Sequence, residues 1–462
     1  MGDAARERVS DAARKQLGDA ARSGVPPREA LAVWVRVAVQ SFGGPAGQIA
    51  VVHRIVVDEK GWLSERRFLH ALSYCMLLPG PEAQQLTTYV GWLLHGVRGG
   101  LVAGTLFILP GFLSILLLSV LYAGYRDVGL VAGLFYGLKP AVLAVVVEAL
   151  LRLRRRALTG RFDALLAAAA FVAIFVFAVP FPVIVAAAAL AGLGLRRAGA
   201  RAAPPEGGEP DDFGGTSGVE PRVRPSLVAA ARTALLWAAI WFVPLLVLLA
   251  ALGPAHVLVR EGAFFSRTAV VTFGGAYAVL AYVAQQAVEA YGWLAAGEML
   301  DGLGMAETTP GPLIQVVQFV GFMGAWRNPG GLDPMLAGVL GSLVATWATF
   351  APCFLFIFVG APFVEHLRGN RALSAALGGI MAAVVGVVLN LAVWFALHTL
   401  FGELETVALG PARLLAPVPT TLDVAALAIA AGAMVAMLRF RIGMLPTLGA
   451  AAVAGVALQA LS

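Results

Sequence analysis

The chain has 462 residues, of which 59% are hydrophobic and 13% are charged, and its formal net charge is +6. Soluble domains carry about 25% charged residues, so the composition excludes an ordinary soluble protein and indicates an integral membrane protein. Its apolar runs reach the roughly 20 residues that a membrane-spanning helix needs, whereas barrel strands would be half as long. Because the arginines gather at the ends of these runs, they predict topology, and no nucleic acid is expected as a partner.

In chain order, the first element is a helix predicted at residues 1–27, where Asp-Ala-Ala-Arg occurs three times. Its mixed charge predicts a cytoplasmic amphipathic helix, and we expect no signal peptide because an apolar core and a cleavage site are missing. A first membrane unit is predicted at 28–197 and a second at 227–462. The segment between them, 198–226, is rich in Gly, Pro and acidic residues and is predicted to be a disordered cytoplasmic linker.

The same block of residues occurs in both units, 231 positions apart. Phe-Gly-Gly at 42–44 returns at 273–275, and Pro-Gly-Pro at 79–81 returns at 310–312. Aligned without a gap, residues 36–84 and 267–315 share 18 identities in 49 positions. A duplicated hydrophobic unit that is interrupted by Gly and Pro is typical of transporters with a binding site between the repeats.

The arginines predict that the two units face opposite ways. Five of them follow the first-unit span that ends at Leu150: Arg152, Arg154, Arg155, Arg156 and Arg161. That end is therefore predicted to be cytoplasmic, whereas residues 398–405, after the matching second-unit span, contain no arginine and are predicted to lie outside. The predicted fold is an all-α polytopic membrane protein, with two homologous halves in an inverted-topology repeat and about 13 spans.

Each Pro-Gly-Pro motif is predicted to break one helix and start another. The first proline lacks an amide donor, the glycine adopts conformations closed to other residues, and the second proline suits the first position of a new helix. In mid-membrane, the free amides and positive dipole end of that new helix can hold an anion. The alternative is that these residues only shape kinks and tight helix packing. We favour binding because both motifs occur twice.

Candidate ligands lie in and around these motifs. The glycines allow close backbone approach, and the glutamines can donate hydrogen bonds to tetrahedral oxygens. The two arginines occupy equivalent positions and can bind oxyanion edges or anchor helices at the interface. Lys139 lies mid-span, where a charge usually serves function, against the alternative of a structural pair with Glu148 or with a neighbouring helix. The predicted set is Arg36, Phe42, Gly43, Gly44, Gly80, Pro81, Gln84, Gln85, Lys139, Arg267, Gly274, Gly275, Gly311, Pro312 and Gln315.

Glu82 stands in the first turn after the first Pro-Gly-Pro motif. A carboxylate there is favoured by the helix dipole as a structural cap, but in its ionised form it would repel a dianion. In its protonated form it could donate a hydrogen bond to the substrate. The proton-coupling hypothesis is that Glu82 takes up a proton on one side of the transport cycle and releases it on the other. Glu307, beside the second motif, is a second candidate for this role.

These motifs resemble a known family. FGGPAGQIA at 42–50, LLPGPEAQQL at 77–86, GLKP at 137–140 and the second-half copies are similar to the chromate ion transporter family in its long-chain, two-domain form. The resemblance covers about residues 28–460. It implies export of chromate, with sulfate as the isosteric relative, across the bacterial inner membrane, driven by ion gradients. The position of Glu82 makes the proton the expected coupling ion. Since FGGAYAVLA and PGPLIQ depart from the first-half motifs, the two half-sites are not expected to be chemically equivalent.

Three alternatives are an uptake carrier for sulfate or another oxyanion, an oxyanion channel, and a membrane-embedded enzyme. The sequence has no HExxH or GxSxG motif and no histidine pair at metal-ligand spacing, so we expect no enzyme, no metal and no cofactor. Chromate and sulfate share charge and shape, so ligand residue types do not separate them. The expected partners are the oxyanion, protons and the lipid bilayer, and a homodimer is left open.

Overall fold

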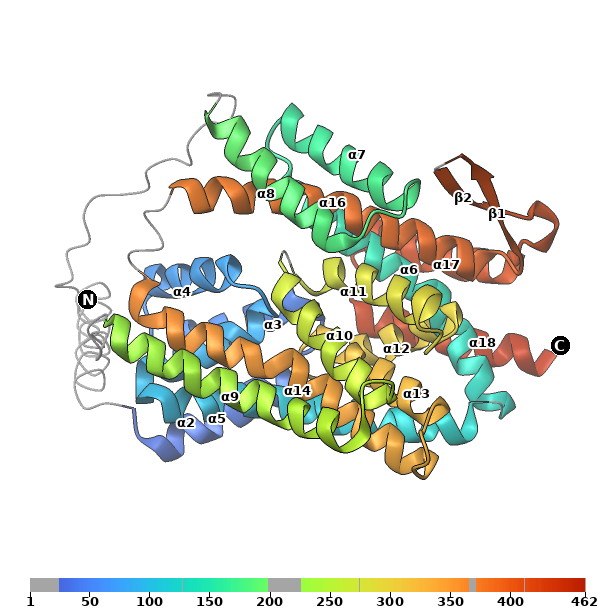
Figure 1. Cartoon of the computed structure of the whole chain (residues 1–462). Helices are drawn as coiled ribbons and strands as arrows, with labels where there is room; N and C mark the ends of the chain where they lie inside the picture. Colours follow the sequence, from blue (N-terminus) through green and yellow to red (C-terminus); the bar gives the residue numbers. More distant parts are fainter. Residues whose placement is uncertain are drawn as a thin grey trace, which may run out of the picture.

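The computed structural model describes residues 25–126, 128–197, 226–273, 275–364, 371–410 and 412–461. Helices make up most of it, and the axes of the long helices are roughly parallel or antiparallel to one another (Figure 1). Six of the described helices are long and apolar enough to cross a membrane, which confirms a multi-pass helical membrane protein. Residues 1–24 of the predicted amphipathic helix, residues 198–225 of the predicted linker, and Gly274 lie outside the described residues.

The two units are built from matching elements. The first helices pair at the offset of 231 residues found in the sequence: α2 (Pro27–Gln40) with α10 (Val257–Val271), α3 (Gly44–His53) with α11 (Ala276–Gln285), and α4 (Glu65–Leu77) with α12 (Ala296–Thr308). Both α3 and α11 run on into a π-helical turn, η1 (Arg54–Glu59) and η2 (Gln286–Ala290). Gly61 and Gly292 then turn the chain with φ of 59° and 61°. Because even this irregular turn is duplicated, the repeat is structural as well as sequential.

α5 (Glu82–Tyr125) consists of two helices. The backbone leaves the helical conformation at His95 and at Gly96, where φ is 64° and ψ is −155°. A Cβ on Gly91 would lie 2.5 Å from the carbonyl oxygen of Gly99, so the halves before and after the break pack back to back. We call these halves α5a and α5b. Their counterparts in the second unit are α13 (Val316–Arg327), preceded by the 3-10 turn η3 (Leu313–Gln315), and α14 (Pro334–Gly360), which ends in the 3-10 turn η4 (Ala361–Phe363).

The closing helices of each unit pack on the other unit. The long helix of the first unit is α6 (Gly129–Ala157), and its counterpart at an offset of 242 is α16 (Arg371–Leu400). The first unit continues with α7 (Arg161–Phe175) and α8 (Phe181–Arg197), which lie against α16. The second unit continues with α17 (Val424–Met434), the π-helical turn η6 (Val435–Arg439) and α18 (Met444–Leu461), and α17 and α18 lie against α6.

Small residues allow the closing helices of each unit to pack closely against the long helix of the other unit. A Cβ on Gly137 of α6 would lie 2.0 Å from the carbonyl oxygen of Ala451, and one on Gly379 of α16 would lie 2.2 Å from that of Ala188. Gly137 and Gly379 are equivalent positions in the two units. Such small-residue contacts are the usual means by which membrane helices approach one another.

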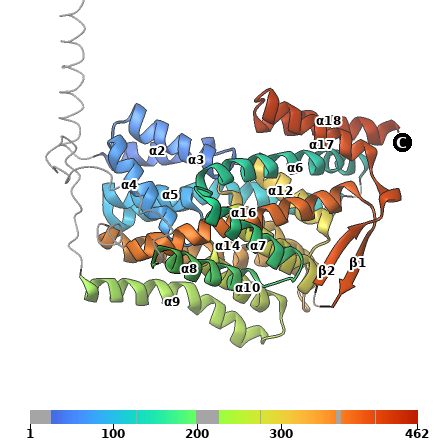
Figure 2. The ribbon, with the colours of Figure 1, turned by 90° about the horizontal axis from the view of Figure 1, so that it is seen from above.

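α9 (Leu227–Leu252) is an additional span at the start of the second unit, before α10, the first repeated helix. It lies at one edge of the molecule, at the opposite edge from α18 (Figure 2). It packs on α10 and α14, where Trp237 stacks on Phe354 with ring centroids 5.6 Å apart. Most of its surface is exposed and apolar, as expected for a helix that faces lipid.

A two-stranded hairpin, which the sequence analysis did not predict, follows α16. β1 (Leu404–Leu409) and β2 (Ala412–Pro417) pair antiparallel, with Leu404 opposite Pro417, and the 3-10 turn η5 (Pro419–Thr421) leads on to α17. The hairpin is an exception to the predicted all-α class. The count of about 13 spans stays a prediction, because helices of 10 to 15 residues such as α3 and α10 reach only about 15 to 22 Å.

Candidate functional site

The Gly-rich breaks of the two units are tied to each other across the unit boundary. The N–H of Gly80 donates to the carbonyl oxygen of Thr272 at 2.8 Å, and the N–H of Gly311 donates to that of Ser41 at 2.9 Å. Each Pro-Gly-Pro motif is therefore bound to the residue that precedes Phe-Gly-Gly in the other unit. We call this region, residues 41–44, 79–82, 272–273, 275 and 310–312, the crossing.

Glycine is required at the centre of each Pro-Gly-Pro motif. Gly80 and Gly311 have φ of 132° and 111°, which side-chain-bearing residues rarely adopt. A Cβ on Gly311 would also lie 3.0 Å from the Cα of Gly111 on α5b, and a Cβ on Gly80 would lie 3.0 Å from the Sγ of Cys353 on α14. Gly111 and Cys353 are equivalent positions. Each bend is thus supported by the long helix of the opposite unit.

Four helices begin at the crossing. α3 starts at Gly44, α11 at Ala276, α5a at Glu82, and η3, which continues as α13, at Leu313. The predicted restart at the second proline of each Pro-Gly-Pro motif is confirmed to within one residue, because Pro81 and Pro312 are extended N-cap residues and the helices begin at the next position. The first amides of a helix have no intrahelical acceptor, and its N-terminus carries about half a positive charge. Four N-termini therefore provide about two positive charges, although the crossing contains no lysine or arginine.

Two carboxylates stand at the crossing, each beside a glycine of the other unit. A Cβ on Gly275 would lie 3.7 Å from Oε1 of Glu82, and a Cβ on Gly44 would lie 3.9 Å from Oε2 of Glu307. Glu307 is buried, and its Oε1 accepts a hydrogen bond from the hydroxyl of Tyr277. Its Oε2 has no hydrogen-bond partner among the described residues. The two carboxylates occupy non-equivalent sequence positions, so the half-sites differ.

Buried amide side chains surround the starts of α5a and α13. Gln84 donates to Thr88 at 3.0 Å, and Gln315 donates to Gln318 at 2.7 Å. The side-chain oxygens of Gln84, Gln85 and Gln315 have no hydrogen-bond partner among the described residues. Because buried polar atoms are nearly always satisfied, these oxygens are candidates to accept a hydrogen bond from water or from a protonated ligand.

Gln48 contacts the crossing, and the sequence analysis did not identify it as a site residue. It is buried on α3, and its Nε2 donates to the carbonyl oxygen of Gly311 at 2.6 Å. Its position within the FGGPAGQIA run could have identified it from the sequence. The equivalent position in the second unit is Val279, which cannot donate a hydrogen bond from its side chain, so the second unit has no matching hydrogen bond at this position.

The two predicted arginines are not at the crossing. Arg36 is on the exposed face of α2, where its guanidinium binds Glu59 at 2.5 Å. Arg267 is on the exposed face of α10. The structure therefore brings together the two glycine motifs, the glutamines and Glu82, but it leaves both arginines on outer faces.

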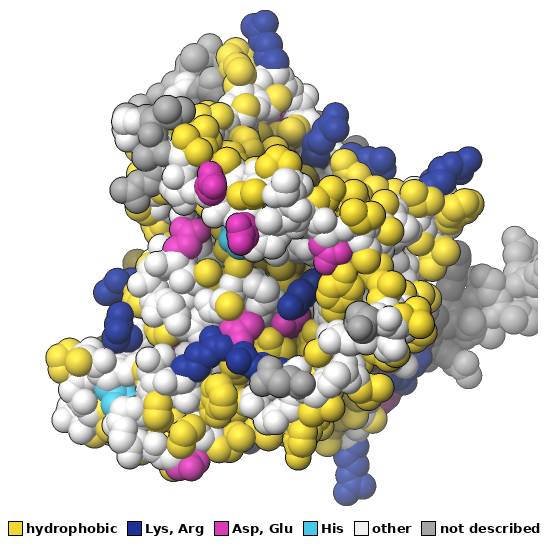
Figure 3. Space-filling view, turned by 90° about the vertical axis from the view of Figure 1, so that its right-hand side faces the viewer, with side chains coloured by type: hydrophobic (Ala, Val, Ile, Leu, Met, Phe, Trp, Pro, Cys, Tyr) yellow, Lys and Arg dark blue, Asp and Glu magenta, His cyan; other side chains and the backbone are white. Residues whose placement is uncertain are grey.

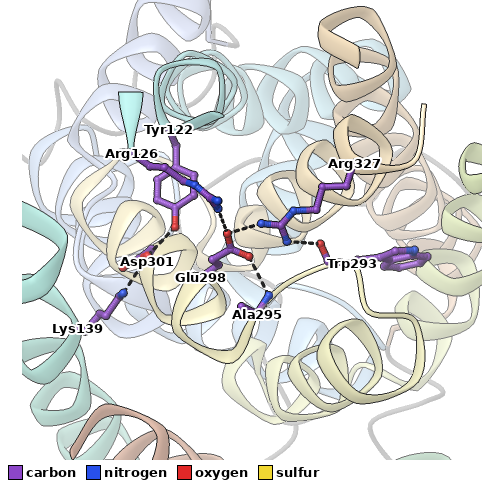
Figure 4. A network of polar contacts seen from close by, with 8 residues as sticks. All are labelled: Tyr122, Arg126, Lys139, Trp293, Ala295, Glu298, Asp301 and Arg327. Atoms are coloured by element: carbon purple, nitrogen blue, oxygen red, sulfur yellow. Dashed lines mark hydrogen bonds and ion pairs between the residues drawn. The ribbon is translucent and has the colours of Figure 1, made fainter. Parts of the chain in front are cut away.

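Lys139 belongs to a polar network on α12 (Figure 4). Its Nζ lies 3.4 Å from Oδ2 of Asp301, which also accepts a hydrogen bond from the hydroxyl of Tyr122 at 2.7 Å. One turn earlier, Glu298 binds both Arg126 and Arg327. The partner of Lys139 is therefore Asp301, and Glu148 pairs with Arg152 at 2.5 Å.

Replacing Lys139 with Met is expected to destabilise the protein, because it leaves the buried Asp301 carboxylate without its cation. Breaking a buried pair typically costs about 3 to 5 kcal/mol, and the half-exposed lysine places this pair at or below the lower end of that range. The measurement is the thermal unfolding midpoint in detergent.

The control is the double variant Lys139→Met/Asp301→Asn, which removes both charges and should recover most of the lost stability. If the double variant were no more stable than Lys139→Met, the lysine would not act through this ion pair.

A duplicated set of broken helices, with four N-termini meeting at a buried crossing, defines a polytopic membrane protein of two homologous units. Residues 28–193 and 259–456 match the chromate transporter family, and the chain belongs to that family.

Relatives align over most of the chain. It is 32% identical over 372 residues to a chromate transport protein of Pseudomonas aeruginosa, covering 79% of this chain and 80% of that protein. It is 26% identical over 368 residues to a chromate transport protein of Cupriavidus metallidurans, covering 78% and 80%. It is 25% identical over 359 residues to a probable chromate transport protein of Synechococcus elongatus, covering 77% and 81%. No solved structure matches the chain.

Proposed function

We propose that the protein is a secondary active transporter that exports chromate, and its isostere sulfate, across the bacterial inner membrane, with the oxyanion bound at the crossing. Family membership and the named relatives support the substrate class. The observation that carries the site is the pair of crossed hydrogen bonds, from Gly80 to Thr272 and from Gly311 to Ser41. They hold the N-termini of four helices at one place, where the partial charges together match a dianion.

The chemistry of the crossing suits a tetrahedral dianion that binds together with protons. Backbone amides at the helix starts and the amide groups of Gln84 and Gln315 supply neutral donors. Ionised Glu82 and Glu307 would repel the dianion, whereas their protonated forms can donate to it. Binding of the oxyanion and protonation of these carboxyls are therefore coupled. Moving a lone dianion out of a cell with a negative interior is worth about 4.6 kcal/mol per 100 mV, and each proton that leaves with it lowers this by about 2.3 kcal/mol. The membrane potential therefore favours export when fewer than two protons accompany the dianion.

An inverted-topology repeat is part of the proposal. Asp423 supports it, because this residue contacts equivalent helices at opposite ends. Its N–H donates to the carbonyl oxygen of Leu400, the last residue of α16, and its carboxylate accepts from the hydroxyl of Tyr136, seven residues into α6. The end of α16 is thus beside the beginning of α6, so the two helices run in opposite directions. With the linker end cytoplasmic, the β-hairpin end of Figure 1 faces outward.

The proposed function is tested by uptake of labelled chromate and labelled sulfate into everted membrane vesicles, with and without an imposed pH gradient. We expect saturable uptake that depends on the expressed protein. Preloading the vesicles with unlabelled chromate should accelerate entry of the label, because a carrier exchanges its substrate. Absence of both oxyanion fluxes would refute the function, and flux without counterflow would indicate a channel.

Gln84→Ala and Gln315→Ala are each expected to raise the KM for chromate by about 10- to 100-fold, since a hydrogen bond to a charged group contributes about 1.5 to 3 kcal/mol. Gln40→Ala is the matched control, because Gln40 is exposed on α2 and bonded to Arg54. The measurement is the concentration dependence of initial uptake rates. If both glutamine variants kept the wild-type KM, the crossing would not be the binding site.

A further inference from the structure

The last turns of α6 carry a row of charged side chains. Glu148, Arg152 and Arg156 are spaced by four residues and therefore lie on one face of the helix. Glu148 and Arg152 form an ion pair at 2.5 Å, and the side chains of Arg152 and Arg156 are exposed. We call these three residues the α6 row. Arg154 and Arg155 belong to the same helix end but lie off this row.

The α6 row begins beside the helix that leads to the crossing. α6 packs on α12, and a Cβ on Gly304, one turn before Glu307, would lie 3.4 Å from Cγ2 of Val142 on α6. Glu148, the first residue of the row, lies six residues after Val142 on α6. The row therefore extends from the neighbourhood of the Glu307 end of α12 to an exposed helix end.

The equivalent row in the second unit lines a cavity. At an offset of 242, Glu148, Arg152 and Arg156 correspond to Asn390, Trp394 and His398 of α16. These three residues line a cavity of about 350 Å³, together with Glu289 of η2 and Leu415 of β2. Its volume is in the range of small-ligand pockets, about 300 to 1,000 Å³. The indole nitrogen of Trp394 donates to Oε1 of Glu289 at 3.3 Å.

α11 connects this cavity to the crossing. The helix begins at Ala276, beside the crossing residue Gly275, and its last residues Ala281, Ala284 and Gln285 line the cavity. The cavity lies beneath the hairpin at the end of the molecule seen in Figure 3, where charged side chains stand among hydrophobic ones. Two equivalent helix faces thus approach the crossing from opposite ends of the molecule.

Charge distinguishes the two approaches. The α6 row has two guanidinium groups and one carboxylate, whereas the α16 face and the cavity beside it contain Asn390, Trp394, His398 and the carboxylate of Glu289. Guanidinium groups bind oxyanion edges through parallel hydrogen bonds, and their field raises the local concentration of anions. The neutral and acidic cavity offers a dianion no such attraction.

We propose that Arg152 and Arg156 form a collecting site for tetrahedral dianions at the mouth on the α6 side, and that the cavity beneath the hairpin is the release mouth. This inference rests on the proposed function and adds a side preference to it. The oxyanion first binds the two guanidinium groups and then passes to the crossing. On the other side it meets no arginine and departs, so the apparent affinity is higher on the α6 side.

The test compares two charge-matched variants in vesicles of both orientations. Arg152→Gln/Arg156→Gln removes the collecting arginines, and Arg154→Gln/Arg155→Gln removes the same charge from the same helix end. In everted vesicles, which load from the α6 side, we expect the first variant to raise the KM for labelled chromate about ten-fold and the second to change it less than about two-fold. In right-side-out vesicles, which load from the hairpin side, both variants should keep the wild-type KM.

The outcomes separate this inference from the proposed function. If wild-type protein transported neither oxyanion, the proposed function would fail. If wild-type protein transported chromate but the two variants changed the KM equally, the arginines would act only through topology, and the collecting site would be refuted. A rise in KM from the hairpin side as large as that from the α6 side would refute the side preference.

A second variant tests the release mouth independently. Glu289→Gln removes the acidic group of the cavity with little change in shape. We expect it to lower the KM from the hairpin side about three-fold without changing the KM from the α6 side. An unchanged KM from the hairpin side would show that this cavity does not lie on the transport path.

Discussion

Gly311→Ala is expected to abolish chromate transport and to lower the thermal unfolding midpoint of the purified protein. At φ of 111°, the alanine would adopt a backbone conformation that costs about 1 to 3 kcal/mol. Its Cβ would also lie 3.0 Å from the Cα and 3.1 Å from the nitrogen of Gly111. Since these are backbone atoms of α5b, neither side can yield without moving a helix, and the bond from Gly311 to Ser41 would be lost.

Gly124→Ala is the matched control, because Gly124 is on α5b, the helix against which Gly311 packs, and a Cβ there would meet no atom within 4 Å. That variant should transport like wild type and unfold at the same temperature. The measurements are initial chromate uptake and the unfolding midpoint by circular dichroism in detergent. Normal transport by Gly311→Ala would show that close packing of this bend is dispensable and would remove the structural basis of the proposed site.

The broken helices could be predicted because their cause is local. A proline without an amide donor and a glycine with positive φ interrupt a helix in any surroundings, so the restarts at Glu82 and Leu313 followed directly from Pro-Gly-Pro. The duplication was equally visible, since it needs only an alignment of the chain with itself. These local features predicted the elements of the crossing and most of its residues.

The pairing of these elements could not be predicted. Gly80 binds Thr272 and Gly311 binds Ser41, and nothing in either motif names its partner in the other unit. In an apolar chain nearly every helix face is hydrophobic, so periodicity does not show which face meets which neighbour. The exchange of closing helices between the units was hidden for the same reason.

Charged residues show the same limit. Lys139 was recognised as unusual because of its depth, but its partner Asp301 is on a helix of the other unit. Arg36 was grouped with the ligands by its position in the repeat. The π-helical turn that carries Glu59 back to Arg36 has no sequence signal that we could read. The sequence shows which charges are unusual, but it does not show which side chains they contact in the fold.

Glu82→Gln is expected to separate oxyanion exchange from proton coupling. Glutamine keeps the size and a hydrogen-bond donor of the protonated acid, but it does not titrate. The variant should therefore still exchange external labelled chromate for internal unlabelled chromate at a rate within about three-fold of wild type. It should lose the response of uptake to an imposed pH gradient, which wild-type protein is expected to show as faster entry when the α6 side is acidified.

The direction of the pH effect on uptake follows from the repulsion between ionised Glu82 and the dianion. Acidification protonates Glu82, which removes its repulsion of the dianion, so the wild-type rate should rise as the pH on the loading side falls. Glu403→Gln, an exposed carboxylate near the hairpin, should leave both exchange and pH response intact. Because Glu307 stands beside Gly44 as Glu82 stands beside Gly275, Glu307→Gln decides whether one carboxyl or both carry the coupling. A full pH response in the double variant Glu82→Gln/Glu307→Gln would place the coupling proton elsewhere in the protein.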